Sequence, residues 1–169
     1  NKKMGPGAGG DISRKIDLVA EKTVIDIVNQ SGANPTIIAE ECGTIKGNDS
    51  GYIIMDAIDG TTNVTRAIPF NCCSLAYSTD STLSSVVDAA VMDIARGDLY
   101  YASKGKGAFL NGSRINVRKY ENIKEDEIIA GINISGVSSE LLHSMSPIIT
   151  KLNHIRIFVA NALVLCFLA

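Results

Sequence analysis

One helical segment followed by many short apolar runs is the feature that most limits the fold of this 169-residue chain. Residues 12–30 carry apolar side chains at helical spacing. The runs after residue 36 are short and separated by turn residues, among which Asn111-Gly112 is a strong hairpin signal. One helix before many predicted antiparallel strands indicates the α+β class. The predicted helical stripe comprises Ile16, Ala20, Thr23 and Ile27, widened by Val24 and Val28. The predicted strands are 37–39, 52–55, 72–78, 85–94, 99–103, 108–110 and 128–134, and later helices are expected at 140–152 and 160–169.

Composition excludes several classes of protein. Hydrophobic residues make up 46% of the chain and charged residues 20%, which is enough apolar material for a sizeable core. The formal net charge of −2 argues against a generic surface for nucleic acid polymers or anionic membranes. No signal peptide is recognised, so the cytoplasm is the expected compartment.

Acidic side chains gather in the segment 56–63, which reads Asp-Ala-Ile-Asp-Gly-Thr-Thr-Asn. An apolar run ends at Asp56, and a short turn would place the Asp56 and Asp59 carboxylates on the same side of the backbone. Two close carboxylates stay ionised only if a cation lies between them, and oxygen ligands without His or Cys indicate Mg²⁺ or Mn²⁺. Glu40 ends an earlier apolar run in the same way. If the two runs are adjacent strands, three acids meet at one sheet edge.

Gly60 and Thr61 add the features of an anion site. Glycine lets the backbone approach a ligand closely, and free N–H groups at the start of a following helix bind phosphate. A metal site beside a phosphate site is typical of phosphoryl hydrolysis. An EF-hand is excluded because Met55 and Ala57 would occupy its first and third ligand positions. A simple Asx turn between two strands explains the same residues equally well.

Asp17 is an acid on an apolar face of the first predicted helix, where it shares the side of Ala20, Val24 and Val28. Two interpretations are open. A carboxylate at the rim of an amphipathic helix is common, and geometry alone favours it. The alternative is a carboxylate directed inward at a functional site.

Several segments resemble the inositol monophosphatase-like superfamily, the lithium-sensitive, Mg²⁺-dependent phosphatases. Residues 56–63 resemble its D-P-[IL]-D-G-T-x-N signature, with Ala57 in place of proline. Residues 37–42 resemble its apolar-E-E-S segment, and residues 85–117 are similar to its long hairpin. The run 63–69 is especially similar to archaeal members that hydrolyse both fructose 1,6-bisphosphate and inositol 1-phosphate.

The resemblance implies a layered αβαβα sandwich. Residues 1–125 would form an α+β metal- and phosphate-binding domain with an antiparallel sheet, and residues 126–169 the beginning of a second, truncated α/β domain. The apolar helix expected at 160–169 ends without Gly or a basic turn, so we interpret the chain as a fragment. A further metal-binding aspartate of the family would lie beyond Ala169. The full-length protein would be a homodimer.

The resemblance also implies the metal ligands. Glu40, Asp56 and the carbonyl oxygen of Ile58 would hold a first Mg²⁺, with Mn²⁺ as the alternative. Asp56 would bridge to a second ion that Asp59 also binds. A third, weaker ion would share Glu40.

The same resemblance implies the substrate contacts and the catalytic pair. Gly60 and Thr61 would hold the substrate phosphate through backbone N–H groups, beside Asp59. Asp17 would accept a hydrogen bond from the Thr61 hydroxyl, and the pair would activate the attacking water. Arg156 resembles a substrate-contacting arginine, although a solvated charge at a strand end explains it equally well.

The implied function is Mg²⁺-dependent hydrolysis of sugar-phosphate monoesters, fructose 1,6-bisphosphate or inositol 1-phosphate, by a metal-activated water. The expected partner is therefore a small phosphate ester, with no nucleic acid polymer and no membrane. Two alternatives stay open. One is a phosphatase for adenosine 3′,5′-bisphosphate, and the other is a catalytically incomplete metal-binding fragment or interaction module.

Overall fold

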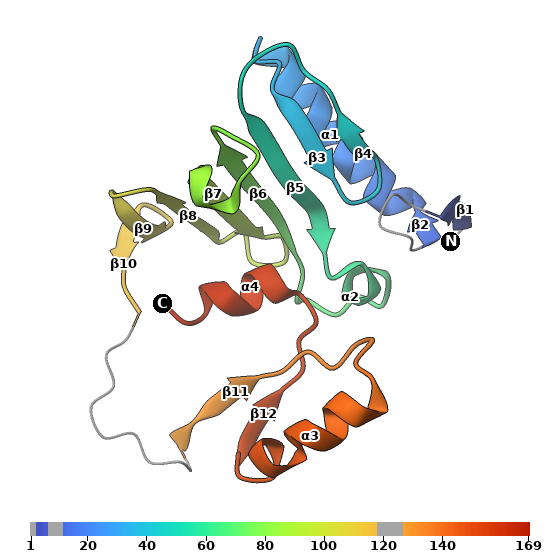
Figure 1. Cartoon of the computed structure of the whole chain (residues 1–169), viewed down its shortest axis with the longest axis vertical. Helices are drawn as coiled ribbons and strands as arrows, with labels where there is room; N and C mark the ends of the chain where they lie inside the picture. Colours follow the sequence, from blue (N-terminus) through green and yellow to red (C-terminus); the bar gives the residue numbers. More distant parts are fainter. Residues whose placement is uncertain (1–2, 7–11, 118–126) are drawn as a thin grey trace.

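The computed structural model describes residues 3–6, 12–117 and 127–169 (Figure 1). The helices are α1 (Lys15–Gln30), α2 (Thr61–Thr65), α3 (Ser139–Ile149) and α4 (Asn161–Cys166), with a 3₁₀ turn at Leu83–Ser85. The strands are β1 (Lys3–Pro6), β2 (Ile12–Arg14), β3 (Thr36–Ala39), β4 (Gly43–Ile45), β5 (Tyr52–Asp59), β6 (Cys72–Ser78), β7 (Val86–Asp93), β8 (Leu99–Ser103), β9 (Gly107–Leu110), β10 (Ser113–Ile115), β11 (Ile129–Gly131) and β12 (His154–Arg156). The predicted α+β class is confirmed.

An eight-stranded sheet dominates the fold, with the strand order β10-β9-β8-β7-β6-β5-β3-β4. Its neighbours are antiparallel except β3 and β5, which run parallel and pair Ala39 with Met55. The predicted antiparallel pairing is therefore present at every neighbouring pair of this sheet except β3–β5, which makes the sheet mixed. The reason is β4, a short strand that the sequence pattern missed: it reverses the chain once after β3, and the segment 46–51 reverses it again before β5. The Asn111-Gly112 hairpin is confirmed, because both residues have positive φ between β9 and β10.

Helix α1 packs on one face of this sheet, with only the Val24 and Val28 side of the predicted stripe. Val24, Ile25 and Val28 contact a cluster around Ile37, Ala39 and Met55, which is buried. The predicted stripe residues Ile16 and Ile27 face solvent instead, and Ile27 is 61% exposed. Helix α1 carries apolar residues on two sides, and the side that packs is the one on which its two buried acids find hydrogen-bond donors. The first three residues of the predicted helix form β2, paired with β1.

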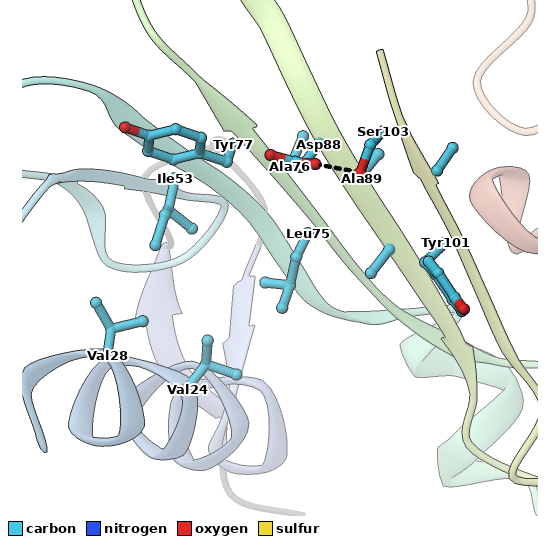
Figure 2. A pocket seen from close by; sticks show the side chains of 12 residues that line it. Val24, Val28, Ile53, Leu75, Ala76, Tyr77, Asp88, Ala89, Tyr101 and Ser103 are labelled. Atoms are coloured by element: carbon cyan, nitrogen blue, oxygen red, sulfur yellow. Dashed lines mark hydrogen bonds between the residues drawn. The ribbon is translucent and has the colours of Figure 1, made fainter. Parts of the chain in front are cut away.

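A hollow of about 310 Å³ lies between α1 and the strands β6, β7 and β8 (Figure 2). Val24 and Val28 point into it from the helix, and Leu75 and Tyr101 from the sheet. The hollow exists because α1 packs mainly against β3 and β5 (Figure 1). The sheet face beyond β5 is consequently left open and apolar.

Helix α4 covers the opposite face of the sheet. Leu163 and Ala160 are fully buried against Cys72 and Tyr100. Cys72 and Leu75 are three positions apart in β6, so their side chains point to opposite faces, and Leu75 belongs to the α1 side. The predicted helix at 160–169 is thus confirmed over Asn161–Cys166. The Phe70 and Phe158 rings, which stack with centroids 4.4 Å apart, extend this second core.

The segment 127–169 begins with a small α/β unit in which β11 and β12 pair in parallel beside α3 (Figure 1). The strand predicted at 128–134 and the helix predicted at 140–152 are therefore present, with shorter bounds. The predicted domain boundary at 125/126 lies outside the described residues, and the two-domain division stays a prediction. In the ranges that the structure covers, none of the helices has the length and apolar character needed to cross a membrane.

Candidate metal and phosphate site

The parallel pair β3–β5 brings Glu40 and Asp56 to the same edge of the sheet. Ala39 is opposite Met55 in the register; Glu40 follows directly after β3, and Asp56 is the next residue of β5. Because the two strands run parallel, two of the three acids predicted to meet, Glu40 and Asp56, come together here. Both line a small cavity of about 10 Å³, which is about the room that one water molecule occupies. Its other lining residues are Asp17, Glu21, Glu41, Ala57, Ile58 and Thr61.

The electrostatics of this cavity favour a cation. Burial, and after it the nearby carboxylates of Glu40 and Asp59, together raise the pKa of the Asp56 carboxyl to about 7. One interaction opposes the shift, because the Ile58 N–H donates to Asp56 Oδ1 at 3.0 Å. Negative groups that repel one another in a half-buried place are relieved by a positive ion.

The hydrogen bond predicted between Asp17 and Thr61 is present. The Thr61 Oγ1 hydroxyl donates to Asp17 Oδ1 at 2.8 Å, although the residues are far apart in sequence. Asp17 is 8% exposed, so its inward direction is confirmed and the interpretation as a rim acid is wrong. The same hydroxyl lies 3.2 Å from the carbonyl oxygen of Ile58. With its hydrogen directed to Asp17, the Thr61 oxygen keeps lone pairs that can accept a hydrogen bond from water.

Gly60 begins helix α2 with a left-handed backbone, at a φ of 96°. A Cβ at this position would lie 3.1 Å from the Phe70 carbonyl oxygen and 3.3 Å from the Ala160 Cβ. Only glycine therefore fits the turn without strain. The backbone N–H of Thr61 follows at the first position of α2, and its predicted role in holding phosphate stays a prediction.

The carboxylate of Asp59 is turned toward α4. Its Oδ2 atom accepts from the Ala162 N–H at 2.8 Å and from the Cys72 thiol at 3.8 Å. Burial raises the pKa of Asp59, and these two donors lower it in part. Asp59 is close enough to Asp56 to affect its ionisation, but it does not line the cavity that holds Glu40. Its assignment to a second ion stays a prediction.

The chemical type of the donor atoms in this cavity suits a hard divalent ion. Glu40, Asp56 and the Ile58 carbonyl supply only oxygen, which is what Mg²⁺ and Mn²⁺ prefer. In the part of the chain that the structure describes, no group of three His, Cys, Asp or Glu side chains could hold an ion by itself. Backbone oxygen and water would complete the coordination, as is usual for Mg²⁺.

Arg156 does not join this cavity. It ends β12, faces solvent, and its Nη1 donates to the carbonyl oxygen of Ile155 at 2.9 Å. The predicted substrate contact of Arg156 therefore rests on the resemblance alone and stays a prediction.

Two residues of this region were not assigned a role from the sequence. Glu21 is 2% exposed and accepts from the backbone N–H groups of Glu41 and Cys42. Asn63 donates from Nδ2 to the carbonyl oxygens of Phe70 and Phe158, at 2.7 and 2.9 Å. The spacing of Glu21 four residues after Asp17 is a signal that could have found it, because such residues share a helix face. No local signal points to the distant partner of Asn63.

Comparison with known proteins identifies the class of this fold and site. A family model described as the inositol monophosphatase family matches residues 3–169, so the chain belongs to the inositol monophosphatase family. It is 34% identical over 174 residues to a fructose-1,6-bisphosphatase/inositol-1-monophosphatase of Methanothermobacter thermautotrophicus, which covers 96% of this chain and 60% of the relative. A bifunctional NADP phosphatase/NAD kinase of Methanocaldococcus jannaschii is 30% identical over 191 residues, covering 95% of this chain and 33% of that protein. The predicted similarity to archaeal members is confirmed.

Solved structures agree with this placement. The extragenic suppressor protein suhB from Bartonella henselae superposes with a TM-score of 0.81 at 28% identity, over 94% of this chain and 62% of that one. The Thermotoga maritima IMPase superposes with a TM-score of 0.76 at 28% identity, over 95% of this chain and 60% of its own. The chain thus spans about 60% of the length of the Methanothermobacter relative and of these two solved structures, and a third of the NADP phosphatase/NAD kinase.

Proposed function

We propose that this chain is the N-terminal part of a Mg²⁺-dependent phosphomonoesterase. The observation that carries the proposal is the hydrogen bond between Thr61 and Asp17, 2.8 Å long, inside the small cavity that Glu40 and Asp56 also line. A proton-accepting pair and a carboxylate pair at one sheet edge are the two halves of a site for hydrolysing phosphate esters. Membership of the inositol monophosphatase family supports the same reaction class.

Each residue contributes a distinct action in this proposal. Glu40, Asp56 and the Ile58 carbonyl would hold one divalent ion, and Asp56 with Asp59 a second. When bound, such ions acidify a nearby water and offset the charge of the phosphoryl oxygens.

The rest of the reaction lies with the protein's own groups. As the water loses a proton to the Thr61 oxygen, Thr61 passes its own hydrogen to Asp17 Oδ1, so the hydroxyl stays neutral. The Asp17 carboxylate is the final proton acceptor and acts as the general base through Thr61. Gly60 and the start of α2 present backbone N–H groups to the phosphate.

The proposed substrates are sugar phosphates, namely fructose 1,6-bisphosphate and inositol 1-phosphate. The names of the archaeal relatives support this choice. Adenosine 3′,5′-bisphosphate and NADP are the comparison substrates, the second because a relative is named an NADP phosphatase. The complete protein would be a homodimer with the five-layered αβαβα arrangement of its family.

Phosphate release from these four substrates, with and without Mg²⁺, tests the proposal on the complete protein. We expect Mg²⁺-dependent release from a sugar phosphate, and its loss in Asp56→Asn. Asp26→Asn is the matched control, because Asp26 faces solvent on α1 and pairs only with Lys22 among the described residues. Mg²⁺ binding without release from any substrate would favour the ion-binding module. Full activity of Asp56→Asn would contradict the proposed metal site.

A further inference from the structure

Glu21 is a fully buried carboxylate that the proposed reaction does not use. It lies on α1 one turn after Asp17 and is 2% exposed. Both of its oxygens are occupied by backbone donors: Oε1 accepts from the Glu41 N–H at 2.8 Å, and Oε2 from the Cys42 N–H at 2.7 Å. The two donors are consecutive residues in the turn between β3 and β4.

The burial of Glu21 costs more free energy than attaching the β3–β4 hairpin to α1 would require. Burying a carboxylate removes it from water at a large cost, which two charge-assisted hydrogen bonds offset. The described cations do not help, since the ion pairs found among those residues are Lys22–Asp26 and Arg96–Asp98. Apolar contacts from Val24 and Val28 already join α1 to the sheet. We therefore interpret Glu21 as fixing the position of the turn after β3 rather than attaching α1 to the sheet.

The position that Glu21 fixes is that of Glu40. On one side of Glu40, the parallel pairing of Ala39 with Met55 sets the backbone. On the other side, Glu21 holds the next two N–H groups. Glu40 thus lies between these two sets of contacts, in the turn 40–42 that the pairing of Ala39 with Gly43 closes.

We propose that Glu21 is a positioning residue that holds Glu40 across the cavity from Asp56. This inference rests on the proposed function, because the role of Glu40 as a metal ligand is part of that proposal. It also makes α1 a single rigid frame for the site. The helix carries Asp17, which orients Thr61 directly, and Glu21, which orients Glu40 through the turn.

The variant Glu21→Gln tests this role in the complete protein. The amide keeps one acceptor but directs an N–H group at a backbone N–H, so one hydrogen bond is lost and a repulsive contact replaces it. We expect the Kd for Mn²⁺, measured by calorimetry, to rise about 10- to 100-fold, the range typical for loss of a partner that orients a ligand. Amide hydrogen exchange at Glu41 and Cys42 should quicken. Asp26→Asn on the same helix should change neither quantity.

The kinetic pattern separates positioning from general structural damage. Excess Mn²⁺ should restore most of kcat in Glu21→Gln, while KM for the phosphate ester stays unchanged. If this variant does not fold, Glu21→Asp keeps the charge on a shorter side chain and should raise the same Kd.

Two results overturn the inference, and they are distinguishable. An unchanged Kd for Mn²⁺ in a folded Glu21 variant, beside a wild type that binds Mn²⁺ and loses it in Asp56→Asn, refutes the role of Glu21 alone. A wild type that binds no Mn²⁺ refutes the proposed function and this inference together.

Discussion

Replacing Asp56 by Asn should stabilise the metal-free protein while abolishing its metal response. The pKa of Asp56 rises from an ordinary value of 3.8 to about 7 because of burial and the nearby carboxylates. Each tenfold change in an ionisation constant is worth about 1.4 kcal/mol, so the upper bound of the cost is about 4 kcal/mol. The side chain is only half-buried, and solvent screening reduces this to about 2 kcal/mol.

The sign of the effect follows from the raised pKa. A carboxyl with a higher pKa in the folded state favours folding below pH 3.8, and this contribution is lost as the pH rises through about 7. In chelator at pH 8, Asp56→Asn should therefore unfold at higher urea, with about 2 kcal/mol more free energy of unfolding. The difference should shrink below pH 7 and vanish near pH 4. Asn keeps an oxygen for the Ile58 N–H, so no hydrogen bond confuses the comparison.

Added Mg²⁺ should reverse the order of stability. An ion that binds only the folded state stabilises it by mass action, and only the wild type retains the ligand. Asp26→Asn serves as the control and should lose a few tenths of a kcal/mol at any pH above 5, since it breaks only an exposed pair with Lys22. If Asp56→Asn is no more stable than the wild type in chelator at pH 8, the account of a carboxylate destabilised by burial and by its neighbours is wrong.

Three further changes have defined outcomes. Asp17→Asn should lower kcat at least tenfold and leave Mn²⁺ affinity nearly intact, since it alters the partner of Thr61 rather than a proposed ligand; joint loss of affinity and rate in titrations would contradict this. Gly60→Ala should lower the free energy of unfolding by about 1–3 kcal/mol in urea, because of its positive φ and close neighbours; a neutral result would mean that the turn is not strained. Glu21→Gln should speed alkylation of the exposed Cys42 thiol at pH 8, because the hydrogen bond and charge of Glu21 raise its pKa to about 11; slower labelling in site-resolved mass spectrometry would refute that cause.

The sequence located the critical strands because its signals there, such as an apolar run that stops at an acid, are local. At Asp56 this signal predicted the strand and the acid, but the predicted strand end is wrong, because β5 continues through a register shift to Asp59. The bounds of β6 and β8 do follow from the apolar runs. The contact between Asp17 and Thr61 was accessible only through the family resemblance, since nothing in the spacing of two distant residues places them together.

The features that the sequence did not predict all depend on tertiary contacts. Helix α1 has apolar residues on two sides, so periodicity alone could not predict that Val24 and Val28 pack while Ile16 and Ile27 face solvent. The parallel β3–β5 pair depends on β4, a strand too short and polar to give a pattern. The direction of the Asp59 carboxylate toward Ala162 depends on a helix that follows a hundred residues later.

That last feature has a consequence for how the molecule acquires its shape. Asp59 and Asn63 form hydrogen bonds to residues near 160, so the loop between β5 and α2 is completed by polypeptide made much later. Contacts across such long stretches of chain carry a large closure entropy and form slowly. On a ribosome, the sheet strands β3 to β10 would emerge and pair well before α4 arrives. We therefore expect the proposed metal and phosphate site to form as one of the last events of folding, after the sheet that supports it.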